Sequence, residues 1–521
     1  MSTNKSVARS ASVISGATLC SRILGFLRDV VMARFFGTGI ASQAFIVAFR
    51  IPNLLRDLVA EGAANAAFVP VFSEYLVKRE REEFWSLVRN VLAIVFALLV
   101  LLTLLGIIST PLITRLIAPG FLSDPNKFNL TVKLVRILFP YLILVGLTAY
   151  SMGLLHTFKS FLTPALSPSM LNLAMISSIL VSVHFLEEPI IGLAWGVLLG
   201  GLLQFLIQLP PMYRRGFRLN LPKLRLDFAH PGIRQIGRLI APRTFGSAIY
   251  QLNVFVDTML ASLANIVGDG AVAAIYYANR IVQFPLAIFG IALSSAVLPT
   301  MSHQVAEGDL ESLKRTLSFS LRAIYLMMLP ISLGLVVLSQ PLIKLLFERG
   351  AFTAYSTSIT SAALLFYAFG LVAYGGVKIL VSCFYSLKDT VTPVKISFIC
   401  LIANIILNLI LMFPLKVAGL ALASSISATL NFIILLTLIK KKVGKIFDPQ
   451  ARDSFFKISL ASMMMALVTY LSWHYYLFRF SPLFSLGAAI LIAALSYLFS
   501  CLLLKVREIR DLSRWLWKKK D

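Results

Sequence analysis

The chain has 521 residues, of which 58% are hydrophobic and only 14% are charged. Soluble domains are about half apolar and about a quarter charged, so this composition excludes an ordinary soluble protein. A net charge of +25 would suggest a nucleic-acid partner in a soluble chain. Here most Lys and Arg residues lie between apolar blocks, which indicates membrane topology and no nucleic-acid binding.

In chain order, the apolar blocks are long enough for helices of about 20 residues, the length that crosses the hydrocarbon core. They predict an all-α polytopic membrane protein with about fourteen transmembrane helices. The first, second, seventh, eighth and tenth of these helices are the most polar. The predicted helices lie near residues 11–36, 42–76, 86–110, 131–156, 162–186, 189–211, 232–263, 270–301, 316–339, 357–386, 393–413, 416–439, 455–477 and 482–505.

Lys and Arg residues concentrate in alternate loops, which predicts the orientation of the helices in the membrane. The segment 212–238 alone carries seven of them, whereas 37–42 carries no charge and 186–189 carries two acids. Positively charged loops stay on the cytoplasmic side. We therefore expect the basic loops and both termini to be cytoplasmic, which agrees with an even number of helices.

Three landmarks recur in the same order at nearly one offset, which indicates an internal repeat. Arg50 matches Arg280 at an offset of 230, Pro70 matches Pro299 at 229, and the Thr-Pro pairs 163–164 and 392–393 also match at 229. The offset spans six helices, so the two copies have the same orientation. The predicted parts are an N-terminal six-helix lobe (1–215), a C-terminal six-helix lobe (216–445) and an appended helix pair (446–521).

Sequence motifs for chemistry are missing. The chain has no GxxxxGK[ST], HExxH or GxSxG motif, and its five histidines are scattered. The four cysteines lie in apolar blocks without metal-ligand spacing, so we expect them to be small packing residues. We expect no enzyme activity, no catalytic residue, no metal and no cofactor, and transport driven by membrane potential or an ion gradient.

Several predicted helices contain ionisable residues, which cannot face lipid without a large free-energy cost. They must face a bundle interior or a watery cavity, and arginines outnumber acids among them. An arginine-lined cavity predicts an anionic substrate, because guanidinium groups bind phosphate or carboxylate in a bidentate manner. The candidate substrate-binding residues are Arg22, Arg28 and Asp29 in the first helix, Arg50, Arg56 and Glu61 in the second, and Arg280 in the eighth.

Three of these residues also have a structural interpretation. Arg50 is as well explained by snorkelling from a helix end to the lipid headgroups. Arg22 and Arg56 are also candidates for structural ion pairs with Asp29 or Glu61. Two further residues are anomalous in apolar blocks. Lys378 suits either a substrate contact or a counter-charge for an acid, and Asp257 is a candidate proton or cation site for ion coupling.

Five stretches together resemble the MurJ/MviN lipid II flippases of the MOP exporter superfamily. They are SRILGFLRD (21–29), FRIPNLLRDLVAEGAANAAFVPVFSEY (49–75), APGF (118–121), YYANRIVQFP (276–285) and FYSLKDTVTPVK (384–395). The resemblance implies a six-plus-six helix repeat and an appended pair that forms a groove for a lipid tail. It also implies that the chain moves undecaprenyl-diphosphate-disaccharide-pentapeptide from the inner to the outer leaflet of the bacterial cytoplasmic membrane, for peptidoglycan synthesis.

The resemblance carries the family's essential cavity arginines onto Arg22, Arg28, Arg56 and Arg280, and its neighbouring acid onto Asp29. This sequence also departs from the pattern. Acids of the family are replaced by amides at three positions, and an acid stands where a second arginine can follow. These departures are Gln43, Asn279, Gln283 and Asp57. They question any mechanism that needs an acid at those sites, and leave the arginine cluster intact.

The implied mechanism is alternating access through an arginine-lined central cavity, in which guanidinium groups replace the hydration of the diphosphate. The implied partners are lipid II, membrane lipids and the cell-wall synthesis machinery. One alternative is a flippase for another polyprenyl-diphosphate-linked oligosaccharide, such as an O-antigen-like chain. A MATE-type drug/cation antiporter is less favoured because the predicted cavity is basic. A membrane glycosyltransferase would need carboxylates on large outward loops, and those loops are short here.

Overall fold

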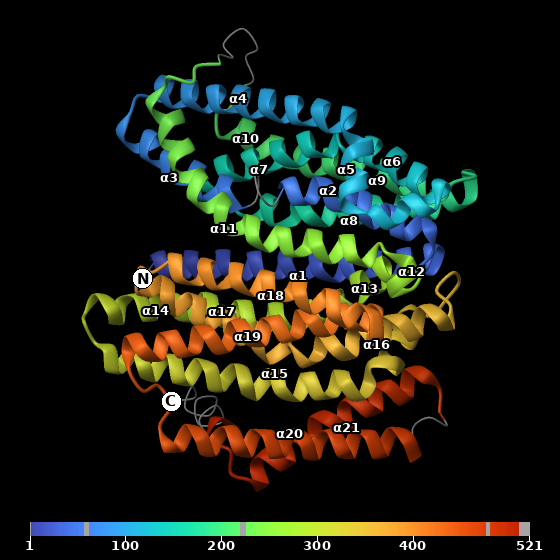
Figure 1. Ribbon diagram of the computed structural model, residues 1–521. Coiled ribbons are helices and arrows are strands. Elements are labelled where there is room, and N and C mark those ends of the chain that lie inside the picture. Colours follow the sequence, from blue (N-terminus) through green and yellow to red (C-terminus); the bar gives the residue numbers. More distant parts are fainter. Residues whose placement is uncertain (1, 57–61, 219–225, 476–479, 510–521) are drawn as a thin grey trace. The chain divides into compact units, whose positions relative to one another are not determined.

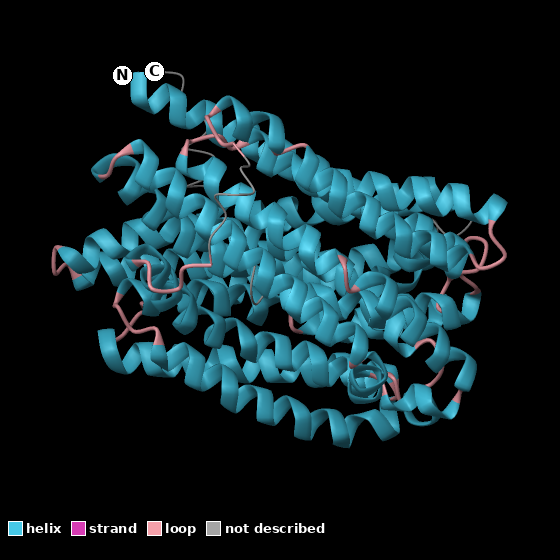
Figure 2. Ribbon diagram, turned by 90° about the horizontal axis from the view of Figure 1, so that it is seen from above, coloured by secondary structure: helices cyan, strands magenta, loops and turns pink. Residues whose placement is uncertain are grey.

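The computed structural model describes residues 2–56, 62–218, 226–475 and 480–509. These residues form helices and no strand, which confirms the predicted all-α class (Figures 1 and 2). The chain divides into two compact units. The first comprises Met1–Leu263 with Arg349–Ala351, and the second comprises Ala264–Glu348 with Phe352–Asp521.

Among its described residues, the first unit contains α-helices and the short 3₁₀ helix η2. In chain order they are α1 (Ser2–Phe36), α2 (Ile40–Arg56), α3 (Gly62–Lys78), α4 (Arg81–Ile108), α5 (Thr110–Ile117), η2 (Pro119–Ser123), α6 (Pro125–Leu138), α7 (Tyr141–Thr157), α8 (Leu162–Phe185), α9 (Pro189–Leu206), α10 (Leu209–Arg214) and α11 (Pro231–Ala261).

In its described part, the second unit contains α-helices and the π-helical turn η4. In chain order they are α12 (Ala264–Val267), α13 (Ala271–Pro285), η4 (Leu286–Ile291), α14 (Ala292–Ala306), α15 (Leu310–Phe347), α16 (Ala354–Phe369), α17 (Leu371–Ser386), α18 (Val391–Leu415), α19 (Val417–Val443), α20 (Pro449–Tyr475) and α21 (Pro482–Leu503).

Within the described residues, 10 helical segments are long and apolar enough to cross a membrane, or up to 11 if α16 and α17, bent by 44°, form one span. The chain is therefore a multi-span membrane protein. The predicted spans at 11–36, 42–76 and 232–263 are not among them. These three spans hold most of the ionisable residues singled out above. The predicted count of fourteen therefore stays a prediction.

Helices α8 and α9 pack closely through a stripe of small residues. A Cβ atom added at Gly192 would lie 2.2 Å from Cβ of Ser182, and one at Gly196 would lie 2.5 Å from Cβ of Ser178. Small residues at such positions let two helix backbones approach closely where no water drives association. The small residues of α9 thus pack directly against α8. This packing fixes the position of α8, which carries Asn172 of the candidate site.

Helices α7 and α17 end in the same backbone conformation, 229 residues apart. Lys159 and Lys388 have φ angles of 56° and 59°, in the left-handed region. The amides of Ser160 and Asp389 each donate to the carbonyl five residues earlier, at 2.9 and 3.0 Å, which is the Schellman pattern. Lys505 repeats this geometry outside the predicted repeat. The separation of the first two ends equals the offset of the repeat, which stays a prediction.

The turn after α17 is bonded to two helices, α18 and α19. The Asp389 carboxylate accepts from the amide of Thr392 at 2.9 Å and binds Lys442 at the end of α19. Burial alone would raise the pKa of Asp389, but the hydrogen bonds from Lys442 and Thr392 outweigh it and lower the pKa to about 2. The contribution of these contacts to the stability of the fold is complete above the ordinary pKa of an aspartate. It is lost only as the pH falls towards 2.

Helix α11 is held on the first unit at both ends. The Asn90 side chain on α4 exchanges two hydrogen bonds with the backbone of Asp227, at 2.9 and 3.0 Å. At the other end, the amide of Gly120 donates to Oγ of Ser262 at 3.1 Å. The compact units accordingly divide at 263/264, whereas the repeat predicts a division at 215/216. The repeat-based division concerns sequence correspondence and stays a prediction.

Gly120 generates a prediction, because a Cβ atom there would lie 2.0 Å from the backbone oxygen of Ser262. We expect Gly120→Ala to lower the free energy of unfolding by about 1–3 kcal/mol, since main chain cannot move aside as a flexible side chain does. The midpoint of thermal unfolding in detergent measures this. Gly237→Ala on α11 is the control, because nothing lies within 4 Å of the added atom. Equal midpoints for the two variants would contradict this explanation.

Candidate functional site

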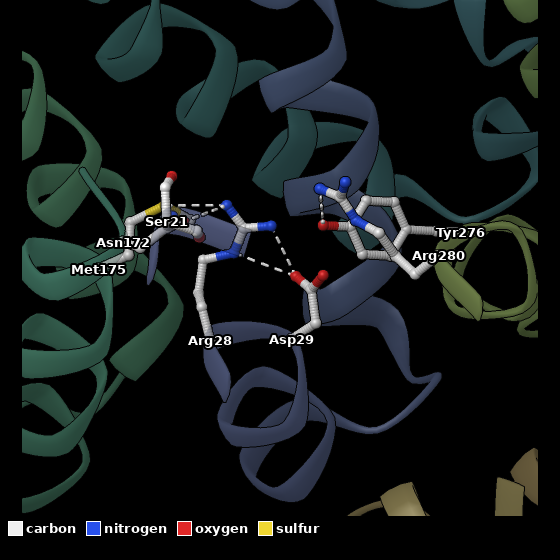
Figure 3. A network of polar contacts seen from close by, with 7 residues as sticks. All are labelled: Ser21, Arg28, Asp29, Asn172, Met175, Tyr276 and Arg280. Carbon is white, nitrogen blue, oxygen red and sulfur yellow. Dashed lines mark hydrogen bonds and ion pairs between the residues drawn. The ribbon is translucent and has the colours of Figure 1, made fainter. Parts of the chain in front are cut away.

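Arg28 and Asp29 form a buried ion pair on α1 (Figure 3). Their exposed fractions are 5% and 1%. Nη2 and Nε of Arg28 donate to Oδ1 of Asp29 at 2.7 and 3.0 Å. Both groups are thus enclosed by the first unit and do not face lipid, which is what the cost of burying single charges requires.

Asn172 on α8 holds the other side of the Arg28 guanidinium. Its Oδ1 accepts from Nη1 of Arg28 at 3.0 Å, and its Nδ2 donates to the backbone oxygen of Ser21 at 3.1 Å (Figure 3). Sδ of Met175 lies 3.9 Å from the same Nη1. A Cβ atom at Gly25 would lie 3.5 Å from the Asn172 amide, so α1 approaches this amide closely. Asn172 therefore fixes the orientation of the guanidinium relative to α1.

The Arg28–Asp29 pair has no net charge. The sequence prediction of an excess of arginine therefore does not apply to this pair. An anion that binds Arg28 must replace Asp29 as a partner or share the guanidinium with it. The site can thus exchange one charge-assisted partner for another, and such bonds are about twice as strong as neutral hydrogen bonds.

Arg22 lies on the same helix as this pair and is exposed. It is therefore not part of the buried network that holds Arg28. The last residue of α2 is Arg56, whereas Asp57 and Glu61 lie outside the described residues. The predicted roles of Arg22, Arg56 and Glu61 in substrate binding stay predictions.

Arg50 on α2 is half-buried, and its Nη1 donates to Oγ1 of Thr258 on α11. Thr258 in turn donates to the backbone oxygen of Val254 at 2.6 Å. Arg50 thus forms a hydrogen bond with a neighbouring helix of the first unit. The next residue, Asp257, is half-buried and accepts from Nδ2 of Asn253 at 3.2 Å. This acid therefore has an amide partner one turn earlier, and its role in ion coupling stays a prediction.

Arg280 belongs to the second unit and lies on α13. Its guanidinium lies 5.1 Å from the ring centroid of Tyr276, and its Nη2 donates to the Tyr276 hydroxyl at 3.2 Å (Figure 3). A cation over an aromatic face is stabilised by the ring quadrupole. The tyrosine thus orients a half-buried arginine with an uncharged group. On the same helix Asn279 is half-buried and Gln283 is exposed, and Lys378 is exposed on α17.

Gln43, one of the positions at which the resemblance implies a departure from the family pattern, is buried in the first unit and contacts a cation. Its Oε1 accepts from Nζ of Lys127 at 3.0 Å, and Nζ lies 4.4 Å from the ring centroid of Phe121. Lys127 is only 4% exposed. The amide oxygen of Gln43 therefore accepts a hydrogen bond from a buried lysine.

The sequence did not identify Asn172, Tyr276 or Lys127 as part of these networks. Asn172 is one polar residue in an apolar helix, and only its place opposite Arg28 reveals its role. Tyr276 has a usable signal, because it precedes Arg280 by one helical turn inside the YYANRIVQFP motif. In the described part of the chain, no three His, Cys, Asp or Glu side chains are grouped in a way that would hold a metal ion.

The model of the family described as "Lipid II flippase MurJ" matches residues 32–491. The chain belongs to the MurJ family. A lipid II flippase MurJ of Burkholderia cenocepacia is 35% identical over 467 residues, which cover 89% of each chain. A probable lipid II flippase MurJ of Vibrio cholerae is 34% identical over 527 residues, which cover 98% of each chain.

Solved structures agree with this assignment. A lipid II flippase MurJ in an inward closed conformation has a TM-score of 0.81 and 29% identity, over 96% of this chain and 99% of that one. An inward-facing MATE-family multidrug resistance transporter of the MOP superfamily has a TM-score of 0.65 over 83% of this chain and 98% of that one. It is 14% identical, so it shows a shared fold alone.

Asn172 generates a prediction about the MurJ site. We expect Asn172→Leu to lower the free energy of unfolding by about 1–3 kcal/mol, because it leaves a buried bond of the Arg28 guanidinium unmade. Thermal unfolding in detergent measures this loss. Leu173→Ala, an exposed change on the same helix, is the control and is expected to have a small effect. An effect of Asn172→Leu no larger than that of the control would contradict a role for Asn172 in holding Arg28.

Proposed function

We propose that this chain flips lipid II from the inner to the outer leaflet of the bacterial cytoplasmic membrane. The observation that carries the proposal is the match to the MurJ family over residues 32–491. The head of lipid II is a diphosphate with sugars and a peptide, which cannot cross hydrocarbon unaided. The flippase supplies polar partners for this head along its path while the prenyl tail stays in an apolar environment.

Arg28 and Arg280 are the residues to which we assign the diphosphate. Arg28 exchanges Asp29 for a phosphate oxygen, so a buried guanidinium always has an anionic partner. Arg280 is oriented by the ring and the hydroxyl of Tyr276, and in this proposal its guanidinium contacts the diphosphate. Alternating access through an arginine-lined cavity then carries the head across. Arg22, Arg50, Arg56 and Glu61 are further contacts in this proposal.

The proposed architecture has fourteen spans, as two six-helix repeats with an appended pair. The matched ends of α7 and α17 support the repeat. Helices α4 and α15 also begin at the repeat offset, at Arg81 and Leu310. Adding the three charged spans to the apolar ones completes the count. Both termini are cytoplasmic, on the side of the basic loops.

No cofactor or catalytic residue takes part in the proposed cycle. Membrane potential or an ion gradient resets it, with Asp257 as the coupling residue. We expect flipping in proteoliposomes to slow when the potential and the ion gradients are dissipated, and Asp257→Asn to remove that dependence. A flipping rate in the unmodified protein that does not depend on potential or gradients would contradict the proposed coupling.

Lipid II and membrane lipids are the proposed partners, with the cell-wall synthesis machinery as a further one.

The proposed site gives a second prediction. Cells depleted of the protein are complemented with variants, and lipid II that is accessible from the outer face is measured. We expect Arg28→Ala and Arg280→Ala to lower accessible lipid II about tenfold or more, because each removes a charge-assisted contact to the diphosphate. Arg34→Ala is the control, since Arg34 is an exposed arginine on the same helix as Arg28.

Normal complementation by both variants would contradict the site. If the variants are poorly expressed, Arg28→Lys provides the test, because lysine keeps the charge and loses the bidentate geometry. Depletion of the protein also separates the alternative substrate. Normal outer-face lipid II together with loss of another polyprenyl-linked oligosaccharide would overturn the proposed function.

A further inference from the structure

The helix pair α20 and α21 is joined to α15 by more than apolar packing. A small core of Leu326, Ile458, Ala461, Cys501 and Val506 lies between the three helices, each at most 2% exposed. Two tyrosines add specific bonds across this core. The hydroxyls of Tyr325 and Ser459 lie 2.7 Å apart, and the Tyr497 hydroxyl donates to the backbone oxygen of Leu326 at 2.7 Å.

A buried ion pair lies beside this core. Nη1 of Arg322 on α15 donates to Oε1 of Glu508, which follows α21, at 2.5 Å. The exposed fractions of the two side chains are 21% and 3%. Within the described part of the chain, Nε of Arg322 and Oε2 of Glu508 are buried without a hydrogen-bond partner. A buried pair with unmet bonding capacity is a poor source of stability, so its value lies in fixing one arrangement.

The positions on α4 that correspond to this polar face in the predicted repeat carry apolar residues. Helices α4 and α15 begin 229 residues apart, at Arg81 and Leu310. At this offset, Arg322 corresponds to Ala93 and Tyr325 corresponds to Phe96, which is 47% exposed. Two apolar positions on α4 are thus an arginine and a tyrosine on α15. The appended pair packs against α15 at these two residues.

We propose that Arg322 and Glu508 are positioning residues that lock the α20–α21 pair onto α15, so that the pair keeps its place while the flippase moves. The ion pair sets the register of α21 on α15, and the two tyrosine bonds hold the helices at that register. This inference rests on the proposed flipping activity for its functional readout, and on geometry alone for its structural readout.

The native cysteines provide the structural test. Cys501 lies in the core at 0% exposure, Cys383 and Cys400 lie elsewhere in the second unit, and Cys20 is exposed on α1. The full-length protein in membranes is treated with N-ethylmaleimide, and modification of each cysteine is read by peptide mass. Arg322→Met, Glu508→Gln and the double variant Arg322→Met/Glu508→Leu are compared. Arg507→Met is the control, because Arg507 binds Gln450 in an exposed contact in the same segment.

We expect each single variant to raise modification of Cys501 and to lower flipping, both by about tenfold, because one charge is left buried without its partner. Cys383 and Cys400 stay protected, which separates release of the pair from unfolding. The double variant recovers flipping and Cys501 protection in part, and the Arg507 control changes neither. Unchanged protection of Cys501 in both single variants would overturn the proposal. So would release of Cys501 with unchanged flipping, and neither result depends on which residues bind the substrate.

Discussion

The cost of placing a charge inside a mostly apolar bundle determines how this flippase is built. Arg28 is tolerated because Asp29 supplies an opposite charge and Asn172 supplies a neutral acceptor. The surrounding fold serves these contacts. Glycines on α9 let α8 pack closely, and α8 then presents Asn172 to α1 at a fixed position. The small residues of one helix thus determine where a guanidinium on another helix lies.

The same constraint is met differently elsewhere in the chain. Lys127 is buried against the amide oxygen of Gln43 and the aromatic ring of Phe121. Arg280 lies over the ring of Tyr276 and donates to its hydroxyl. Arg322 uses Glu508, which neutralises it completely and suits a fixed joint.

The sequence predicted the all-helical, multi-span membrane class, because the length of the apolar blocks reports the membrane directly. It also predicted that Arg28 and Asp29 avoid lipid, since no other location is tolerable for them. It did not predict Asn172, because a single amide carries no signal until tertiary packing places it opposite Arg28. The sequence also did not predict the amide partner of Asp257, which is Asn253 one helical turn earlier. Side-chain partners on other helices depend on packing, which sequence periodicity does not specify.

The central claim is that Arg28 is held ready to exchange Asp29 for a phosphate group. Native mass spectrometry of the purified protein with undecaprenyl diphosphate and with uncharged undecaprenol tests it most directly. We expect the unmodified protein to prefer the diphosphate by roughly tenfold or more, Arg28→Ala to lose that preference, and Asp29→Asn to strengthen it by removing the competing carboxylate. An undiminished preference in Arg28→Ala, or a weaker one in Asp29→Asn, would contradict the account.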